Sequence, residues 1–441
     1  MGLDAKRVRL GMKTGMLGLA IVQLLLTTSS ERIAQAEKDS LTADQKVEDV
    51  AYLYKLMKEN YPYIELSERI TGLDWFSRQD YYAQRAAASE DDEAFLNILE
   101  QLLGRLGNGH TAMVSKEEYA SALRLFLQLQ DERGTHGPWV DQLQQPQVVE
   151  RYQGAQSASE VERKKAEEPA NSETSDKYRI ASELLGRQLR ARNPLKFETL
   201  EEGRVAYLKI PGLQSERKEA DLKQILPFLE EQKDADALIF DIRGNGGGDS
   251  DYWFRIVQRL TNQPRSWTTY QLFRGGEFAK PFIESKMGIS YAQLLPIDEL
   301  KDEHLPSLPP ETFTDFDRYS KDQAQITPYE PIGFEGRIYL LVDAGVFSSA
   351  EAWANFAKES DWATLVGERT GGDGIGWEGA YVALPNSGYV FRMELMMGLD
   401  ATGASNFEAR TLPDIEVDYT RRFAENGDAC VLTALEEEKK Y

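Results

Sequence analysis

The sequence predicts an α/β protein with a small helical domain at its N-terminus. From about residue 197, short apolar runs typical of buried strands alternate with stretches whose apolar residues recur at helical spacing. Between residues 41 and 106 only the helical spacing is present. Alternation of strands and helices is typical of an α/β core. We therefore expect the chain from about residue 197 to be α/β and residues 41–106 to be all helical.

Length and charge limit the kinds of partner. At 441 residues the chain is long enough for two or three domains with full cores. The net charge of −22 repels nucleic acids and anionic lipids, so we expect neither a nucleic-acid partner nor a stable membrane partner. The single cysteine, Cys430, excludes an internal disulfide. The oligomeric state does not follow from these data.

Residues 1–36 have the pattern of a secretory signal. Four lysines and arginines before position 14 precede an apolar run at 16–26, and Ala34-Gln35-Ala36 offers a cleavage site. We expect cleavage after Ala36 and an extracytoplasmic, secreted protein. The alternative is an uncleaved N-terminal anchor.

Residues 37–115 form the predicted helical domain. One helix covers 41–60 before Pro62, and a second begins after the cap candidate Ser89, with His110 in its exit loop. Residues 116–196 are predicted as a helical and polar linker insert: Ser115 with Glu118 opens a helix that ends near Gly134, and 152–177 are too polar to form a core. No PDZ pattern is visible there.

The predicted core covers 197–425, followed by a tail at 426–441. We expect strands at 205–210, 237–242, 338–342 and 364–368, helices at 219–231, 252–260 and after Ser348, and a hairpin around 386–388. Residues 276–331 show little periodicity, and we assign them no element.

Three motifs carry the candidate chemistry. A strand at 336–343 runs through a turn into a helix that starts near Ser348, where unpaired backbone N–H groups stabilise negative charge. The alternative is a purely structural role, in which Ser348 and Glu351 form only a capping box. A strand also runs into the glycine-rich turn at 244–248, and His110 follows Gly107-Asn108-Gly109, although a lone loop histidine is often structural.

These motifs and their order resemble the tail-specific, or C-terminal-processing, serine peptidase family, in its tricorn-core and interphotoreceptor-retinoid-binding-like branch. The resemblance extends from about residue 42 to 420. It implies a crotonase/ClpP-like core of ββα units and an endopeptidase that cleaves unstructured or C-terminal polypeptide segments through an acyl-enzyme. The alternative on the same fold is a non-catalytic protein that binds hydrophobic ligands or peptides.

The resemblance also implies roles for single residues. Ser348 is the expected nucleophile. Some relatives use a lysine base in a TxGKG-like turn, but Asp373 stands at that position here, so the expected base is His110. Glu408, which precedes Pro413-Asp414, is expected to orient His110, with Asp414 as the fallback and a solvated surface acid as the alternative for Glu408.

The expected oxyanion donors are backbone N–H groups of Gly247, or alternatively Gly246, and of Ser349. Asp241 and Arg243 are expected to brace this turn as a pair. The segment 374–379 matches G-x-G-x-x-G but precedes strands rather than a helix. Because the sequence contains no G-x-S-x-G, H-E-x-x-H or cysteine–histidine cluster, it indicates neither a lipase-type elbow nor zinc, and we expect no cofactor.

Overall fold

The structure is a computed structural model of the chain, and it describes residues 41–152, 195–200, 204–418, 423–424 and 427–440. The predicted signal at 1–36 and most of the predicted polar linker lie outside the described residues. Among the described helices, none combines the length and the apolar character needed to cross a bilayer.

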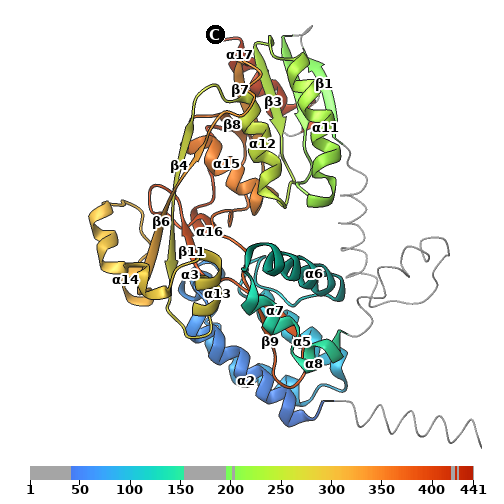
Figure 1. The fold of residues 1–441 in the computed structure, drawn as a ribbon, viewed down its shortest axis with the longest axis vertical. Coiled ribbons are helices and arrows are strands. Elements are labelled where there is room, and N and C mark those ends of the chain that lie inside the picture. The colour runs from blue at the N-terminus through green and yellow to red at the C-terminus, as the bar shows by residue number, and fades with distance from the viewer. Residues whose placement is uncertain (1–40, 153–194, 201–203, 419–422, 425–426, 441) are drawn as a thin grey trace, which may run out of the picture.

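A six-stranded sheet forms the centre of the core, in the order β1-β2-β3-β7-β8-β12 (Figure 1). All neighbouring pairs are parallel except β1 with β2. The strands are β1 (Lys196–Leu200), β2 (Val205–Lys209), β3 (Ala237–Asp241), β7 (Arg337–Val342), β8 (Thr364–Gly367) and β12 (Ile415–Glu416). Four of them match the predicted strands.

Helices cover both faces of this sheet. Leu208 and Phe240 point to the face covered by α11 (Ser215–Glu231), α12 (Ser250–Leu260) and α15 (Ser349–Glu359). Tyr207 and Ile239 point to the other face, which α17 (Ala429–Glu438) covers with Cys430 and Ala434. Strands buried on both faces are apolar throughout, which explains why their sequence signal is clear. The predicted α/β class is confirmed.

The N-terminal region is helical, as predicted. It contains α2 (Ala43–Asn60), α3 (Ile64–Thr71), α4 (Gln79–Ala87), α5 (Asp92–Gly104), α6 (Lys116–Arg133), α7 (Gly137–Leu143) and α8 (Pro146–Arg151). Ser115 caps α6 as expected. The predicted cap Ser89 is wrong for α5: Asp91 Oδ1 accepts the N–H of Ala94 at 2.7 Å, whereas Ser89 Oγ donates to Ala86.

A second, four-stranded antiparallel sheet takes two of its strands from residues 276–331, to which the sequence assigned no element, and the other two from 265–273 and 397–399. Its order is β11 (Met397–Leu399), β4 (Arg265–Phe273), β6 (Arg318–Ile326) and β5 (Leu295–Pro296), with α13 (Lys280–Met287) beside it. The sequence does not predict β6 because most of its residues are polar and only Tyr319 and Ile326 are buried. The remaining short elements are the 3₁₀ turns Phe76–Arg78, Tyr291–Gln293 and Ile297–Glu303, α14 (Thr312–Asp315), α16 (Asn406–Ala409), β13 (Phe423–Ala424) and β14 (Gly427–Asp428).

One apolar core joins regions that are far apart in the sequence. Buried residues of α2, α5 and α6 pack with residues of β4 and of the predicted hairpin, which consists of β9 (Ala380–Ala383) and β10 (Val390–Met393). This core extends across the boundaries at 115 and 197 that we predicted between domains; the division itself stays a prediction.

The topology brings three loops together. Strands β3, β7 and β8 are neighbours in the parallel part of the sheet, so their carboxyl ends lie at the same edge. Ligands of open α/β sheets bind at such edges. The turns that follow these strands carry Gly247, Ser348 and Asp373.

Candidate active site

Ser348 lies at the junction between β7 and α15 in a strained backbone conformation. Its φ of 58° and ψ of −127° are rare for a residue with a side chain, and such strain often accompanies function. The capping-box interpretation is wrong, because the Ser348 side chain makes no cap hydrogen bond. Glu351 instead accepts hydrogen bonds from Asn406 Nδ2 at 2.8 Å and from Thr411 Oγ1 at 2.7 Å. The Ser348 hydroxyl is therefore available to another partner.

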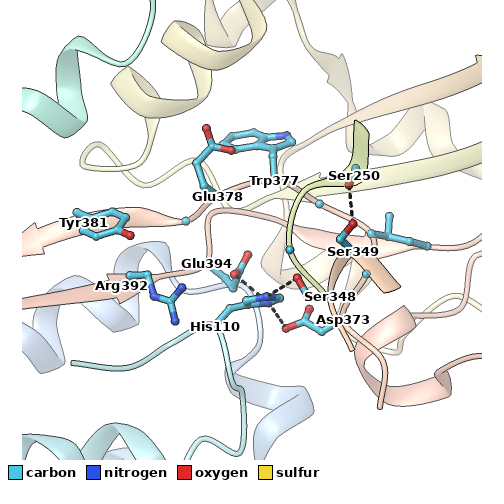
Figure 2. A pocket seen from close by; sticks show the side chains of 15 residues that line it. His110, Ser250, Ser348, Ser349, Asp373, Trp377, Glu378, Tyr381, Arg392 and Glu394 are labelled. Carbon is cyan, nitrogen blue, oxygen red and sulfur yellow. Dashed lines mark hydrogen bonds and ion pairs between the residues drawn. The ribbon is translucent and has the colours of Figure 1, made fainter. Parts of the chain in front are cut away.

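That partner is His110 (Figure 2). Its Nε2 lies 3.0 Å from Ser348 Oγ, and its Nδ1 lies 2.8 Å from Asp373 Oδ2. A carboxylate can only accept at Nδ1, so Nδ1 carries the proton and Nε2 offers its lone pair to the serine. The three side chains have the arrangement of a nucleophile, a base and an orienting acid.

Asp373 is held by groups from the N-terminal region. Asn108 Nδ2 donates to Asp373 Oδ2 at 3.0 Å, and Tyr63 OH donates to Oδ1 at 3.5 Å. Asn108 Oδ1 also accepts the N–H of His110 at 2.7 Å. Asn108 thereby fixes the histidine loop and the acid together, and its side chain is buried.

The histidine loop is also attached to the hairpin strand β10. Val114 N–H donates to Val390 O at 2.8 Å, and Arg392 N–H donates to Ala112 O at 2.8 Å. The ring of Phe347 packs on the His110 imidazole with centroids 4.7 Å apart. A side chain at Gly109 would press on the Phe347 ring at 3.1 Å, which explains a glycine next to the histidine.

The structure contradicts Glu408 as the partner of His110. Glu408 is 41% exposed and forms an ion pair with Arg69 at 2.9 Å. The fallback Asp414 accepts from Lys358 Nζ at 2.6 Å and from the N–H of Leu365. Both acids are engaged elsewhere, while Asp373 faces the histidine.

A signal for Asp373 was present in the sequence. It lies in the turn Thr370-Gly371-Gly372-Asp373-Gly374, at the position where some relatives have a lysine base, and its φ is 59°. An acid there requires a separate base, and His110 fills that place.

Electrostatics favour the protonated histidine. Burial alone would lower the pKa of His110, but the hydrogen bond and the charge of Asp373, together with the charge of Glu394, outweigh it, so the pKa of His110 is raised. Burial also raises the pKa of Glu394 to about 7, helped by Asp373 and opposed by His110 and Arg392. Glu394 Oε1 lies 3.6 Å from His110 Nδ1.

The oxyanion donors differ from the expected set. The N–H of Gly247 donates to Asn245 Oδ1 at 3.0 Å, and Gly246 does not line the pocket at Ser348. The N–H groups of Ser349 and Gly248 have no acceptor among the described residues, and both residues line that pocket. Ser349 therefore stays a candidate oxyanion donor, and Gly248 becomes the second. Gly247 packs against Ser348 instead.

The turn at 244–248 is tied to the serine turn. Asp343 Oδ1 accepts the N–H groups of Gly244 at 2.8 Å and of Gly345 at 3.0 Å. The predicted bracing pair is present: Arg243 Nη2 lies 2.7 Å from Asp241 Oδ2. Burial would raise the pKa of Asp241, but Arg243 holds it below its usual range. Arg243 also pairs with Asp428 at the start of α17.

A pocket of about 410 Å³ opens beside these groups. Trp377, Glu378 and Tyr381 form one wall, and Arg392 and Glu394 form the other (Figure 2). Glu378 is paired with Lys286 at 3.0 Å and with His136 Nε2 at 2.6 Å, which holds it in place. Within the described part of the chain, one cluster offers three donors suitable for a metal ion: His110, Asp373 and Glu394.

Comparisons with known proteins concern the family and the fold. Residues 204–417 match the model of peptidase family S41. A sequence search among curated proteins gives no match. Among solved structures, the chain is similar to a candidate peptidase from Parabacteroides merdae, with 17% identity and a TM-score of 0.53 over 90% of this chain and 97% of that chain.

A second similar structure is mature CPAF complexed with lactacystin, with 14% identity and a TM-score of 0.53 over 90% of this chain and 98% of that chain. At these identities the two structures speak for the fold alone, and the family follows from the match over the core and its motifs. Residues 204–417, the core of the chain, therefore match peptidase family S41, a family of serine peptidases.

Proposed function

We propose that the chain is an exported serine endopeptidase that cleaves unstructured or C-terminal polypeptide segments through an acyl-enzyme. The observation that carries the catalytic part is the chain of hydrogen bonds from Ser348 Oγ through His110 to Asp373. Export is supported by the charged, apolar and small-residue pattern at positions 1–36. The substrate class is supported by the resemblance to tail-specific peptidases.

In this mechanism Ser348 Oγ attacks the carbonyl carbon of the scissile peptide bond while its proton moves to His110 Nε2. The N–H groups of Ser349 and Gly248 hold the oxyanion, at the positive end of α15. His110 then gives the proton to the leaving amine, and the C–N bond breaks to leave an ester on Ser348. A water molecule then attacks the ester carbonyl while His110 takes its proton as the base. The ester bond breaks, Ser348 Oγ regains a proton from His110, and the carboxylic acid product is released. Asp373 keeps Nδ1 protonated and stabilises the imidazolium.

The experiment is labelling of the purified protein by a fluorophosphonate, followed by peptide mapping. Ser348 is expected to carry the label, Ser348→Ala is expected to abolish it, and His110→Ala is expected to reduce it to a slow residual rate. Absence of label on the wild-type protein between about pH 6 and 9, a range that includes the neutral form of a usable histidine, would refute the enzyme. A non-catalytic binding protein on the same fold would then be favoured.

A further inference from the structure

The carboxylate of Glu394 has no part in this mechanism although it lies beside the base. It follows β10, lines the pocket, and is 6% exposed. Among the residues that the structure describes, none makes a hydrogen bond to it, and Figure 2 shows it directed at His110. A buried carboxylate without a donor is costly, so its retention in the pocket needs a reason.

We propose that His110 Nδ1, Asp373 Oδ2 and Glu394 Oε1 form an inhibitory binding site for zinc or a similar divalent transition-metal ion. The site rests on the proposed function, because the ion inhibits by taking the base of the serine mechanism. It requires no further cofactor for catalysis.

The distances suit such an ion. Tetrahedral ligands at about 2.0 to 2.2 Å from zinc lie roughly 3.3 to 3.6 Å from one another. His110 Nδ1 lies 2.8 Å from the Asp373 oxygen and 3.6 Å from the Glu394 oxygen, and all three donor atoms lie within 4.8 Å of one another. Small side-chain movements are therefore enough to place three ligands around one ion.

The chemistry of the donors favours a transition metal over calcium or magnesium. One imidazole nitrogen with two carboxylates is a zinc-type ligand set, whereas calcium needs six to eight oxygen ligands and magnesium a near-octahedral oxygen shell. The carboxylates of Asp373 and Glu394 both approach His110 Nδ1, and a divalent cation neutralises their repulsion. Arg392 supplies a positive charge nearby, which lowers the pKa of Glu394.

Binding of the ion changes the histidine tautomer. Nδ1 must give up its proton to bind the metal, so the ring proton resides on Nε2. Nε2 then donates towards Ser348 Oγ, 3.0 Å away, and can no longer accept the serine proton. The ion also breaks the hydrogen bond between His110 and Asp373. The bound protein has an intact serine but no base.

The ion has a route to the site. His110, Asp373 and Glu394 all line the pocket beside Ser348, and the His110 side chain is 24% exposed. The pocket leaves room for water as a fourth ligand. We therefore expect reversible inhibition that a chelator relieves.

The first test measures the rate of fluorophosphonate labelling with and without zinc chloride, and again after addition of EDTA. The readout is the ratio of the two rates for each variant, so that differences in basal rate cancel. The wild-type protein is expected to label more slowly in zinc and to recover in EDTA, while calcium and magnesium chloride have no effect. Equal rates with and without zinc would overturn the proposal.

The deciding variant is Glu394→Gln, with Glu378→Gln as the matched control. Glu378 is another acid of the same pocket but is already paired with Lys286 and His136. Glu394→Gln is expected to raise the zinc concentration for half-inhibition at least about tenfold, since loss of even an outer-shell partner costs about 10- to 100-fold in affinity. Glu378→Gln should leave it unchanged. Equal inhibition of Glu394→Gln and wild type contradicts the site.

Calorimetric titration of Ser348→Ala with zinc separates the site from the enzyme. This variant cannot label, yet it keeps the three proposed ligands, so it is expected to bind one zinc ion, and the added Glu394→Gln change should weaken that binding at least about tenfold. Absence of binding contradicts the metal site even if Ser348 labels normally. Binding without any labelling of the wild type contradicts the peptidase and leaves the site standing.

Discussion

The serine side and the histidine side of the active site are built differently. The serine side is one continuous stretch, residues 343–351, held by backbone contacts of neighbouring parallel strands and by Asp343. The histidine side joins a loop of the helical region to a turn after β8 through side-chain hydrogen bonds. His110 and Asn108 both bond to Asp373, which is 263 positions from His110 and 265 from Asn108.

Because of this difference, we expect the two sides to be sensitive to different kinds of mutation. The strained Ser348 turn is determined by backbone geometry and by the glycines around it, so it should respond to changes of backbone space. The orientation of His110 depends on single side-chain hydrogen bonds and should respond to changes of one atom. Mutations chosen for each kind can test the distinction.

The largest effect is expected from Asp373→Asn, which changes one atom on the histidine side. The amide can donate to Nδ1 and so favours the tautomer that carries its proton on Nε2. We expect the labelling rate to fall about 10³- to 10⁴-fold, as in other triads with the wrong tautomer.

The matched control is Glu408→Gln, which removes a surface pair with Arg69 and should change the rate little. If both variants lost the same factor in labelling rate, Glu408 would again be a candidate for the acid that orients His110, and the assignment of Asp373 would be refuted.

A smaller loss is expected from Gly247→Ala on the serine side. Gly247 has a φ of 95°, and an added Cβ would lie 2.9 Å from Ser348 Cβ and 2.8 Å from the N–H of Ser349. We expect the nucleophile and one oxyanion donor to shift, with a loss of about 10²- to 10³-fold in labelling rate, comparable to the loss of an oxyanion donor.

Gly246→Ala provides the contrast, because a Cβ there meets nothing within 4 Å. It should label like the wild type, with an unchanged melting temperature. If Gly247→Ala labels as fast as Gly246→Ala, the serine turn tolerates the added atom and the proposed vulnerability of its backbone is wrong.

The smallest effect on labelling is expected from Glu351→Gln, which concerns stability. Burial raises the pKa of Glu351 to about 7 from 4.5, so the folded state binds a proton more tightly than the unfolded state. The contribution of Glu351 to the free energy of unfolding is fully present at low pH. It falls by about 3 kcal/mol as the pH rises from 4.5 to about 7.

The neutral amide of Glu351→Gln can still accept from Asn406 and Thr411. Melting temperatures between pH 4.5 and 8 should therefore fall less for the variant than for the wild type, at a similar labelling rate. Parallel curves would show that Glu351 does not titrate on unfolding.

The comparison also explains what could be predicted from the sequence. The serine turn, the glycine-rich turn and the strands around them are local patterns, and Ser348, Ser349 and the Asp241–Arg243 pair were predictable from them. His110 was predictable from its glycine-rich loop and a family resemblance, but its contact with Ser348 depends on tertiary packing across 238 positions.

The acid could not be predicted in the same way. Glu408 lies in the short helix α16 and Asp373 in the turn after β8, and only the path of the chain decides which one faces the histidine. Gly248 was missed because sequence does not show which N–H of a glycine-rich turn is already bonded, as that of Gly247 is. The polar strand β6 lies in a segment with little periodicity, so no strand was predicted there.

The most direct test of the central claim is a double-mutant cycle between the two residues of the histidine side. Fluorophosphonate labelling rates of His110→Ala, Asp373→Asn and the double variant are compared with the wild-type rate, with intact folding checked by melting temperature. Because Asp373 acts only through His110, the double variant should label no more slowly than His110→Ala alone. A double variant in which the two losses multiply would show that Asp373 acts independently of His110, and would contradict the proposed catalytic unit.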